Sequence, residues 1–385
     1  MNLDHIPILD HHAHAIFHEA GWRTAPLESY FTEAYDPEVL ERHTPHGIFY
    51  RRSLRELAEF YGCEPQRTAV DAARQAADYL EVAQRMIRGA NIDTVLLDDG
   101  LFTGELMSVA ESDSLLPWQA RRVLRLEAVL AGLVWQHDRV SDLLHSFESH
   151  LRQVAPTLAG LKSVIAYRTG LAVEKWDAGE VQAAYDALKR DLKTGETPKL
   201  TSKPLLDTAL LLALRVARDV DLPVQFHTGY GDPDLDLRLA NPLHLRSLFE
   251  DPDLRGLKIV MLHCYPFTRE AGYLASVYPG AYLDLSLSIP FLSQHGMRTH
   301  VHEALHLSPL SKLLFATDAS RTPELFYLGA RWGRRMLGEV LDDTVRVGDL
   351  TANEAEEAAV MLLRGNASAL YPAPVQPNAP TQVQA

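Results

Sequence analysis

The stretch Ile8-Leu9-Asp10-His11-His12-Ala13-His14 is the point from which the rest of the chain is interpreted. Apolar residues lead into it, and on a β-strand side chains two residues apart point to the same side. His12 and His14 therefore face one space together, and neutral imidazole is the commonest protein ligand for zinc and similar metals. The pair alone is equally typical of an exposed strand or a loop, so a metal site has to be argued from residues further along the chain.

Composition limits the classes of function. The chain has 385 residues, of which 46% are hydrophobic, and its net charge is −14 with His counted as neutral. Such a charge argues against a nucleic-acid or anionic-membrane surface, although a locally positive site for an anionic substrate remains compatible with it. No run approaches the roughly 20 apolar residues of a membrane helix. The N-terminus lacks the basic and then apolar pattern of a signal peptide.

Cysteine use is sparse, with Cys63 and Cys264 as the two members and no Cys-x-x-Cys. Two cysteines cannot make a disulfide framework, so a reducing compartment is indicated. We expect a cytoplasmic homo-oligomer that acts on a small molecule and binds neither nucleic acid nor membrane.

Strand-like and helix-like segments alternate along most of the chain. Amphipathic helical patterns, such as those at 140–154, 181–192 and 205–220, separate most of eight β-rich runs, at 6–12, 94–97, 122–126, 161–167, 223–226, 257–262, 281–285 and 312–316. This alternation indicates parallel strands with crossover helices, and eight of them predict a closed (β/α)₈ TIM barrel. An open doubly wound sheet is the alternative, but no Gly-x-Gly-x-x-Gly follows an early strand.

Two regions depart from the alternation. Residues 18–90 form a helical insertion after the first strand, with helical spacing over 53–61 and 70–89, and Ser53 with Glu56 is typical of a capping box. Helices over 323–341 and 352–365 then complete one domain over residues 1–370. Residues 371–385 are Pro, Gln, Ala and Val-rich without a charged side chain, and this composition predicts a disordered tail.

Polar residues stand at the C-terminal ends of several strands, where TIM barrels carry their chemistry. His12 and His14 end the first strand, and the others follow later runs: Lys162 in the fourth, His227 after the fifth, His263 after the sixth and Asp318 after the eighth. Taken singly, Asp318 could cap a helix and Lys162 could lie on the surface with its stem on apolar groups. Together they predict a metal site formed by His12, His14, His227 and Asp318.

This order of residues resembles the amidohydrolase superfamily, and most closely its amidohydrolase-2 branch of metal-dependent TIM-barrel hydrolases. The resemblance covers about residues 9–370. Three long runs are similar to the amidohydrolase-like domains fused to glutamine-synthetase-like domains in some fungal and plant proteins. They are Leu161-Lys-Ser-Val-Ile-Ala-Tyr-Arg-Thr-Gly-Leu171, Gln225-Phe-His-Thr-Gly-Tyr-Gly-Asp232 and Leu314-Phe-Ala-Thr-Asp-Ala319.

The resemblance implies roles for these residues. His12, His14, His227 and Asp318 would hold a divalent metal, most simply zinc, with manganese or iron as alternatives. A metal lowers the pKa of bound water towards neutrality, and Asp318 would accept the proton of that water and pass it on. His263 would bind a second metal or orient a substrate oxygen. Lys162 would be a carbamate that bridges two metals, as in two-metal members, or an uncarboxylated neighbour of a single metal.

Substrate contacts are less clearly marked in the sequence. Arg168, next to Tyr167, could clamp a carboxylate with its planar guanidinium, or it could pair with Asp232 or Asp234 and fix a loop. Glu127 could reach the barrel mouth or begin a helix. The implied activity is hydrolysis of an amide, lactone or related carbonyl. A non-oxidative decarboxylase or a sugar isomerase on the same site is the alternative, and a non-catalytic binding barrel is the less favoured rival.

Overall fold

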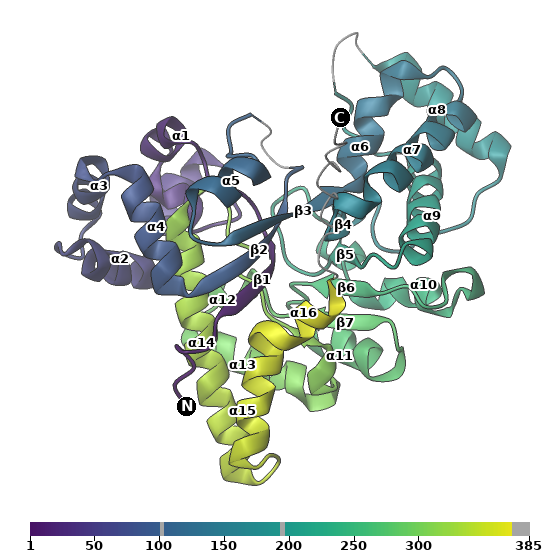
Figure 1. Ribbon diagram of the computed structural model, residues 1–385. Helices are drawn as coiled ribbons and strands as arrows, with labels where there is room; N and C mark the ends of the chain where they lie inside the picture. Colours follow the sequence, from purple (N-terminus) through teal and green to yellow (C-terminus); the bar gives the residue numbers. More distant parts are fainter. Residues whose placement is uncertain (101–103, 193–196, 372–385) are drawn as a thin grey trace, which may run out of the picture.

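The strands form the eight-stranded parallel barrel that the alternation predicts (Figure 1). In this computed structural model, residues 1–100, 104–192 and 197–371 are described. Each strand pairs with the next in parallel register, in the order β1 to β8. The strands are β1 (Ile8–Ala13), β2 (Ile92–Asp98), β3 (Gln119–Arg125), β4 (Gly160–Ser163), β5 (Val224–His227), β6 (Ile259–Leu262), β7 (Ala281–Asp284) and β8 (Leu313–Leu314).

The barrel closes where the chain beyond β8 meets β1. The amide of Asp318 donates to the carbonyl of His12 at 3.0 Å, and the amide of His14 donates to the carbonyl of Ala319 at 2.8 Å. The Asp10 carboxylate accepts from the backbone amide of Thr317 at 3.0 Å and from the Thr317 hydroxyl at 2.5 Å. We call these contacts the seam. They place the first and last predicted ligand positions side by side.

Helices surround the barrel, with α1–α4 on one side of the strands and α7–α9 on the other in Figure 1. Those up to β5 are α1 (Glu19–Thr24), α2 (Ile48–Tyr61), α3 (Arg67–Ala76), α4 (Tyr79–Ala90), α5 (Val109–Leu115), α6 (Leu126–Leu133), α7 (Val140–Val154), α8 (Ala178–Asp191) and α9 (Lys203–Asp219). Those after β5 are α10 (Arg246–Glu250), α11 (Thr268–Val277), α12 (Ser288–Phe291), α13 (Gln294–Leu307), α14 (Pro323–Val347), α15 (Ala352–Val360) and α16 (Asn366–Leu370).

The insertion after β1 is helical, as expected, but its boundaries differ from the prediction. Ser53 lies inside α2, where its hydroxyl donates to the carbonyl of Phe49 at 2.9 Å, so the capping box there is wrong. The helix expected over 70–89 is two helices, because Asp78 has extended backbone and caps α4 by accepting from the amide of Glu81. Helical periodicity does not reveal such a break when both helices bury the same face.

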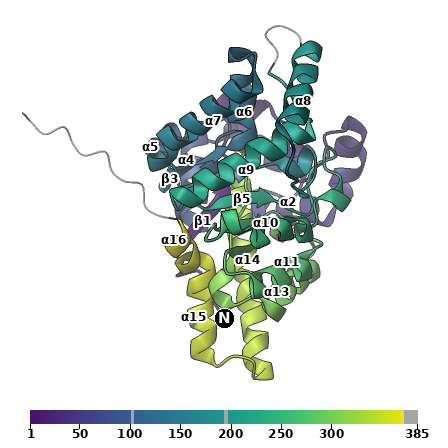
Figure 2. The same cartoon turned by 90° about the vertical axis from the view of Figure 1, so that its right-hand side faces the viewer.

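The last elements pack back onto the barrel. Figure 2 shows α14 and α15 side by side, extending away from the strands, and α16 returns to contact β1 and β8. Tyr371 follows α16 and is buried, at 1% exposure, so the prediction that the tail begins at residue 371 is wrong at that position. Residues 372–385 of that prediction lie outside the described residues. No helix within the described residues is long and apolar enough to cross a membrane.

Candidate metal centre

A cavity of about 300 Å³ opens at the C-terminal ends of the strands. It collects all six predicted ligand positions and two of the predicted substrate contacts. Its lining includes His12, His14, Lys162, His227, His263, Asp318, Tyr167 and Arg168. These residues come from β1, β4, β5 and the segments that follow β1, β4, β6 and β8, so distant parts of the chain meet in one place.

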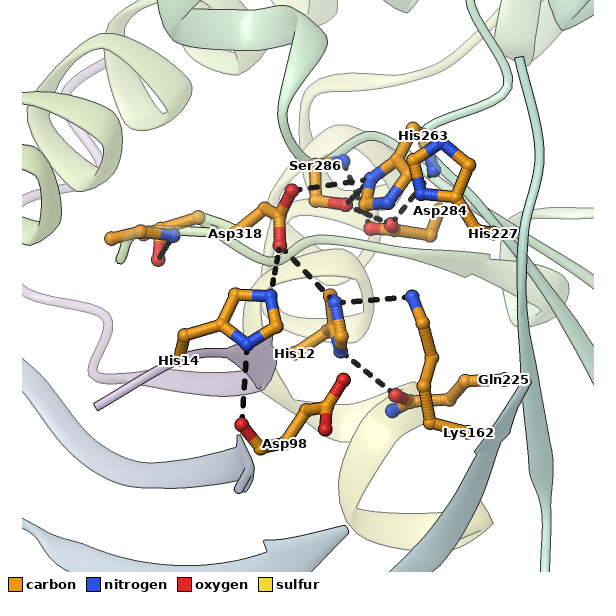
Figure 3. Close-up of polar contacts among 12 residues, drawn as sticks. His12, His14, Asp98, Lys162, Gln225, His227, His263, Asp284, Ser286 and Asp318 are labelled. Carbon is orange, nitrogen blue, oxygen red and sulfur yellow. Dashed lines mark hydrogen bonds and ion pairs between the residues drawn. The ribbon is translucent and has the colours of Figure 1, made fainter. Parts of the chain in front are cut away.

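The centre of the site is the Asp318 carboxylate, with imidazoles on both of its oxygens (Figure 3). Its Oδ1 lies 3.1 Å from His12 Nε2 and 3.5 Å from His14 Nε2, while its Oδ2 lies 3.7 Å from His263 Nδ1. Potential ligand atoms of His12, His14 and Asp318 all lie within 4.8 Å of one another. These three residues are therefore close enough together to share one ion.

The hydrogen bonds behind the two imidazoles show where their protons are. His12 Nδ1 lies 2.8 Å from Gln225 Oε1, and His14 Nδ1 lies 3.2 Å from the backbone carbonyl of Asp98. Both partners are oxygens that only accept, so each Nδ1 carries the proton and each Nε2 presents a lone pair.

Two lone pairs thus face Asp318 Oδ1, which is buried and accepts no hydrogen bond from the residues that the structure describes. Acceptors this close repel one another unless a cation lies between them. The donor set of His12, His14 and Asp318 therefore fits a divalent metal.

His227 and His263 extend this group along one side of the cavity. Their ring centroids are 4.5 Å apart, and the His263 ring is 5.7 Å from that of His12. His227 Nε2 donates a hydrogen bond to the carbonyl of Tyr230 at 3.1 Å, which leaves the lone pair on Nδ1. His227 therefore has a free ligand atom, although it is one ring removed from the three-residue cluster.

Lys162 is buried at 2% exposure, and its Nζ lies 3.4 Å from His12 Nε2. Asp98, at the end of β2, lies close enough to Lys162 and His14 for its charge to interact with both. Its carboxylate accepts from the guanidinium Nη2 of Arg125 at 2.6 Å. The paired Arg125 keeps the pKa of Asp98 well below its usual range despite burial.

Burial dominates the electrostatics of the other groups. It lowers the pKa of His12 to about 4, with Lys162 adding to the effect, and it lowers the pKa of His227 and His263 well below the usual value. It also lowers the pKa of Lys162 to about 8. Neutral imidazoles around an ionised carboxylate are the protonation states that metal binding requires.

The predicted substrate residues divide into two groups. Arg168 and Tyr167 line the cavity, where the Tyr167 ring lies 4.5 Å from that of His227. Arg168 makes no ion pair within 4.0 Å to Asp232 or Asp234 among the described residues, and Asp234 is paired with Lys199 at 2.6 Å. The buried Nε of Arg168 has no hydrogen-bond acceptor in the described part of the chain.

Glu127 has a different place. It lies in the first turn of α6, outside the cavity lining, and its carboxylate accepts from Ser163 Oγ at 2.7 Å and from the amide of Val164 at 3.1 Å. These bonds secure the end of β4, and they match the expectation that Glu127 begins a helix. We do not propose it as a substrate-binding residue.

The structure adds cavity residues that the sequence reading missed. Glu33 and Arg321 line the cavity from the insertion and from the segment after β8. Burial, reinforced by the nearby charge of Asp318, raises the pKa of Glu33 to about 7. Glu33 has no signal in the sequence, because it lies in an irregular part of the insertion. Asp98 could have been found, since it follows an apolar strand in the same way as the predicted ligands.

Comparisons with known proteins place these observations in a family. A model of the amidohydrolase family matches residues 172–373, more than half of the chain, and this range includes His227, His263 and Asp318. Protein fluG of Emericella nidulans is 32% identical over 406 aligned residues, which cover 96% of this chain. They cover 46% of fluG, so this chain spans about half the length of that curated relative.

Two solved structures are similar over nearly the whole chain. A Lactobacillus casei ATCC 334 protein described as a "putative metal-dependent hydrolase" is 30% identical, with 96% of both chains covered and a TM-score of 0.85. Uronate isomerase from Thermotoga maritima is 14% identical, with 96% of this chain and 95% of that chain covered and a TM-score of 0.63. At that identity the isomerase shows a shared fold and nothing more.

Proposed function

This chain belongs to the amidohydrolase family, and from that premise we propose that it is a metal-dependent hydrolase of an amide, lactone or related carbonyl bond. The observation that carries the proposal is the meeting of two imidazole lone pairs with a carboxylate oxygen at His12, His14 and Asp318. His227, with a free Nδ1, would complete a four-ligand set. Zinc is the metal that this nitrogen-rich set favours.

The reaction that we propose uses residues already in place. When bound, the metal supplies Lewis-acid chemistry, which acidifies a water and polarises the substrate carbonyl. Asp318 Oδ2 accepts the proton of the attacking water and passes it to the leaving group. His263 lies 3.7 Å from that oxygen and orients either the proton acceptor or a substrate oxygen.

Lys162 determines how many ions the site holds. We propose that its Nζ adds to carbon dioxide and loses a proton, which gives a carbamate whose oxygens would add to the ligands for two metals. The supporting observation is a buried amine 3.4 Å from His12 Nε2, where a positive charge would repel a bound cation. An unmodified Lys162 beside a single ion is the alternative.

We also propose that the substrate carries a carboxylate. Arg168 presents a guanidinium with an unused, buried Nε at the cavity wall, next to the Tyr167 ring. A carboxylate would satisfy that N–H by a charge-assisted bond. Arg168→Lys should then raise KM at least tenfold for a carboxylate substrate, with less effect on kcat, because lysine cannot reproduce the planar pair of donors.

The test combines metal analysis with a substrate panel. Purified protein, loaded with zinc, is assayed on N-acyl amino acids, γ-glutamyl amides, lactones and aromatic carboxylates, with products identified by mass spectrometry. Hydrolysis that a chelator abolishes and zinc restores supports the proposal. Release of carbon dioxide from an aromatic carboxylate would instead assign a decarboxylase, and an ion-loaded protein with no turnover at all would favour a binding barrel.

A further inference from the structure

We propose that Tyr371 is a positioning residue of the metal centre, because it closes a hydrogen-bond chain beneath the cavity that joins His12 to His263. The inference rests on the proposed metal site and adds to it a residue with no part in the predicted ligand set. Tyr371 is 1% exposed and reaches the barrel from the end of α16. Its hydroxyl contacts two residues next to the ligands, Gln225 and His11.

The first half of this hydrogen-bond chain sets the orientation of the Gln225 amide. Gln225 Nε2 donates to the carbonyl of His11 at 2.7 Å and to the Tyr371 hydroxyl at 3.0 Å. Both of its N–H groups are thus used, so the amide oxygen has to face His12 Nδ1, 2.8 Å away. If the amide turned over, it would set an N–H against the His12 Nδ1–H and lose both other bonds.

The donors and acceptors in the second half of the hydrogen-bond chain follow from those in the first half. Tyr371 Oη accepts from Gln225, so its own proton is free for His11 Nδ1, 3.2 Å away. His11 Nδ1 is then an acceptor, and His11 Nε2 donates to Asp284 Oδ1 at 3.2 Å. Each of these side-chain donors therefore has an acceptor within the described structure.

Asp284 and Ser286 extend the hydrogen bonds to the imidazole of His263 (Figure 3). The Ser286 hydroxyl donates to Asp284 Oδ2, which leaves its oxygen to accept from His263 Nδ1 at 2.8 Å. The amide of His263 also donates to Asp284 Oδ2, at 3.2 Å. His263 therefore carries its proton on Nδ1 and a lone pair on Nε2, as His12 does.

Burial gives this arrangement its effect. The side chains of His11, Gln225, Asp284 and Ser286 are 0% exposed, so water cannot replace a bond that is lost. Partners behind a metal-ligating imidazole typically change metal affinity 10–100-fold when they are removed. Tyr371 acts through Gln225, and its removal should therefore release the amide and weaken the metal site without a change in any ligand.

The test measures zinc affinity of the full-length apoprotein by competition with a chromophoric chelator. Tyr371→Phe should weaken zinc binding about tenfold or more. Tyr185→Phe is the matched control, because Tyr185 on α8 is likewise buried, at 0% exposure, and its hydroxyl donates to the backbone carbonyls of Val134 and His137 in the outer helical layer. Equal zinc affinities in wild type and both variants, with similar losses of Tm, would reduce Tyr371 to a packing role.

Two further measurements separate the outcomes. The losses of zinc-binding free energy in Tyr371→Phe and Gln225→Met should not add in the double variant, because both changes act on the same His12 proton. Additive losses would contradict the proposed hydrogen-bond chain. In zinc-loaded wild type, ¹⁵N spectra of the imidazoles should show His12 protonated on Nδ1, and a proton on Nε2 would overturn the inference without any variant. A wild-type protein that binds no zinc would instead contradict the proposed function.

Discussion

The Nδ1 atoms of His12 and His14 have their hydrogen-bond partners on the side away from Asp318, and this decides what the Nε2 atoms can bind. Each imidazole donates its N–H to an oxygen, Gln225 Oε1 for His12 and the Asp98 carbonyl for His14, and presents a lone pair to the cavity. The identity of the neighbours, as much as that of the histidines, makes the pair suited to bind a cation.

The first prediction concerns this pair. In the double variant His12→Ala, His14→Ala, metal content should fall to below about a tenth of the wild-type value, since two of the three clustered ligands are gone. Elemental analysis of protein purified without added metal provides the measurement. Unchanged metal content would contradict the assignment. His150→Ala with His145→Ala, on α7, is a control for removal of histidines elsewhere.

The second prediction concerns Lys162. Lys162→Ala should reduce the zinc content from two ions to one per chain, and a short carboxylic acid should partly restore activity by taking the place of the carbamate. Lys162→Arg should not respond to the acid, because its guanidinium stays charged and fills the space. A crystal structure with an unmodified amine at Lys162 and one fully occupied metal would exclude the carbamate.

How much of the site the sequence predicts depends on the residue. Period-two spacing and the strand-end rule bring out the six predicted ligand positions, which meet in one cavity, and both signals are local. Gln225 lies two residues before His227 on β5, so the same period could have indicated it. Tyr371 could not be found in this way, because its role depends on a contact with His11, 360 residues away.

At the scale of elements, α14 connects the insertion to the barrel through one buried carboxylate. Glu324, in the first turn of α14, is 0% exposed and accepts from Arg74 Nε at 2.6 Å, from Tyr61 Oη at 3.0 Å and from Trp22 Nε1 at 3.1 Å. Glu324 follows Asp318 by six residues. The insertion is therefore held to the segment that carries a predicted ligand.

The third prediction tests this connection. Glu324→Gln should lower the free energy of unfolding by about 3–5 kcal/mol, because it leaves the Arg74 charge buried without a counter-ion. Glu339→Gln is the matched control on the same helix, since its ion pair with Arg298 is partly exposed and should be worth less than about 1 kcal/mol. Urea unfolding followed by circular dichroism compares the two, and similar losses would show that the buried pair is not special.

The fourth prediction concerns pH. His300 on α13 is 1% exposed, its Nδ1 bonds to the Thr268 hydroxyl at 2.8 Å, and burial lowers its pKa to about 4, with partial compensation from Asp284. Between that pKa and the ordinary value of 6.5, the unfolded chain binds a proton that the folded chain does not, so stability falls as pH falls.

When the pH falls from about 7.5 to about 5, the free energy of unfolding of wild type should drop by roughly 2 kcal/mol more than that of His300→Gln. Urea unfolding of the two proteins at both pH values gives the difference of differences. Parallel pH dependence in wild type and variant would show that His300 is not held neutral.

Sequence periodicity places the elements better than it places their ends. All eight predicted strands exist, but β4 ends at Ser163 and the chain continues as a short 3₁₀ turn over Ile165–Tyr167. Within β1 the register with β2 shifts between Asp10 and Ala13, and both His11 and His12 reach groups of other strands, Asp284 and Gln225. A strict alternation cannot predict this, because the irregularity depends on the neighbouring strand.

At the scale of the whole molecule, the site straddles the seam that closes the barrel. His12 belongs to β1, His14 directly follows it, and Asp318 lies beyond β8, joined to them by the backbone bonds of the seam. An ion shared by these residues would hold together the two edges of the sheet.

The fifth prediction follows from this position. Metal removal by a chelator should lower the Tm, because an ion that binds only the folded barrel stabilises it by about 2.7 kcal/mol at a hundredfold excess over Kd. Scanning calorimetry with and without zinc measures the shift. The His12→Ala, His14→Ala variant should show no such shift, and an equal shift in both proteins would place the stabilising ion elsewhere.

The seam also sets a time order during synthesis. His12 and His14 leave the ribosome before Asp318, which follows His14 by about 300 residues, and this separation takes roughly 15–60 s at ordinary elongation rates of 5–20 residues per second. Throughout that interval a nascent chain offers an ion two imidazoles and no carboxylate partner across the seam. The cluster of His12, His14 and Asp318 exists only once translation has passed β8, so a captured ion marks a barrel whose last strand has been made.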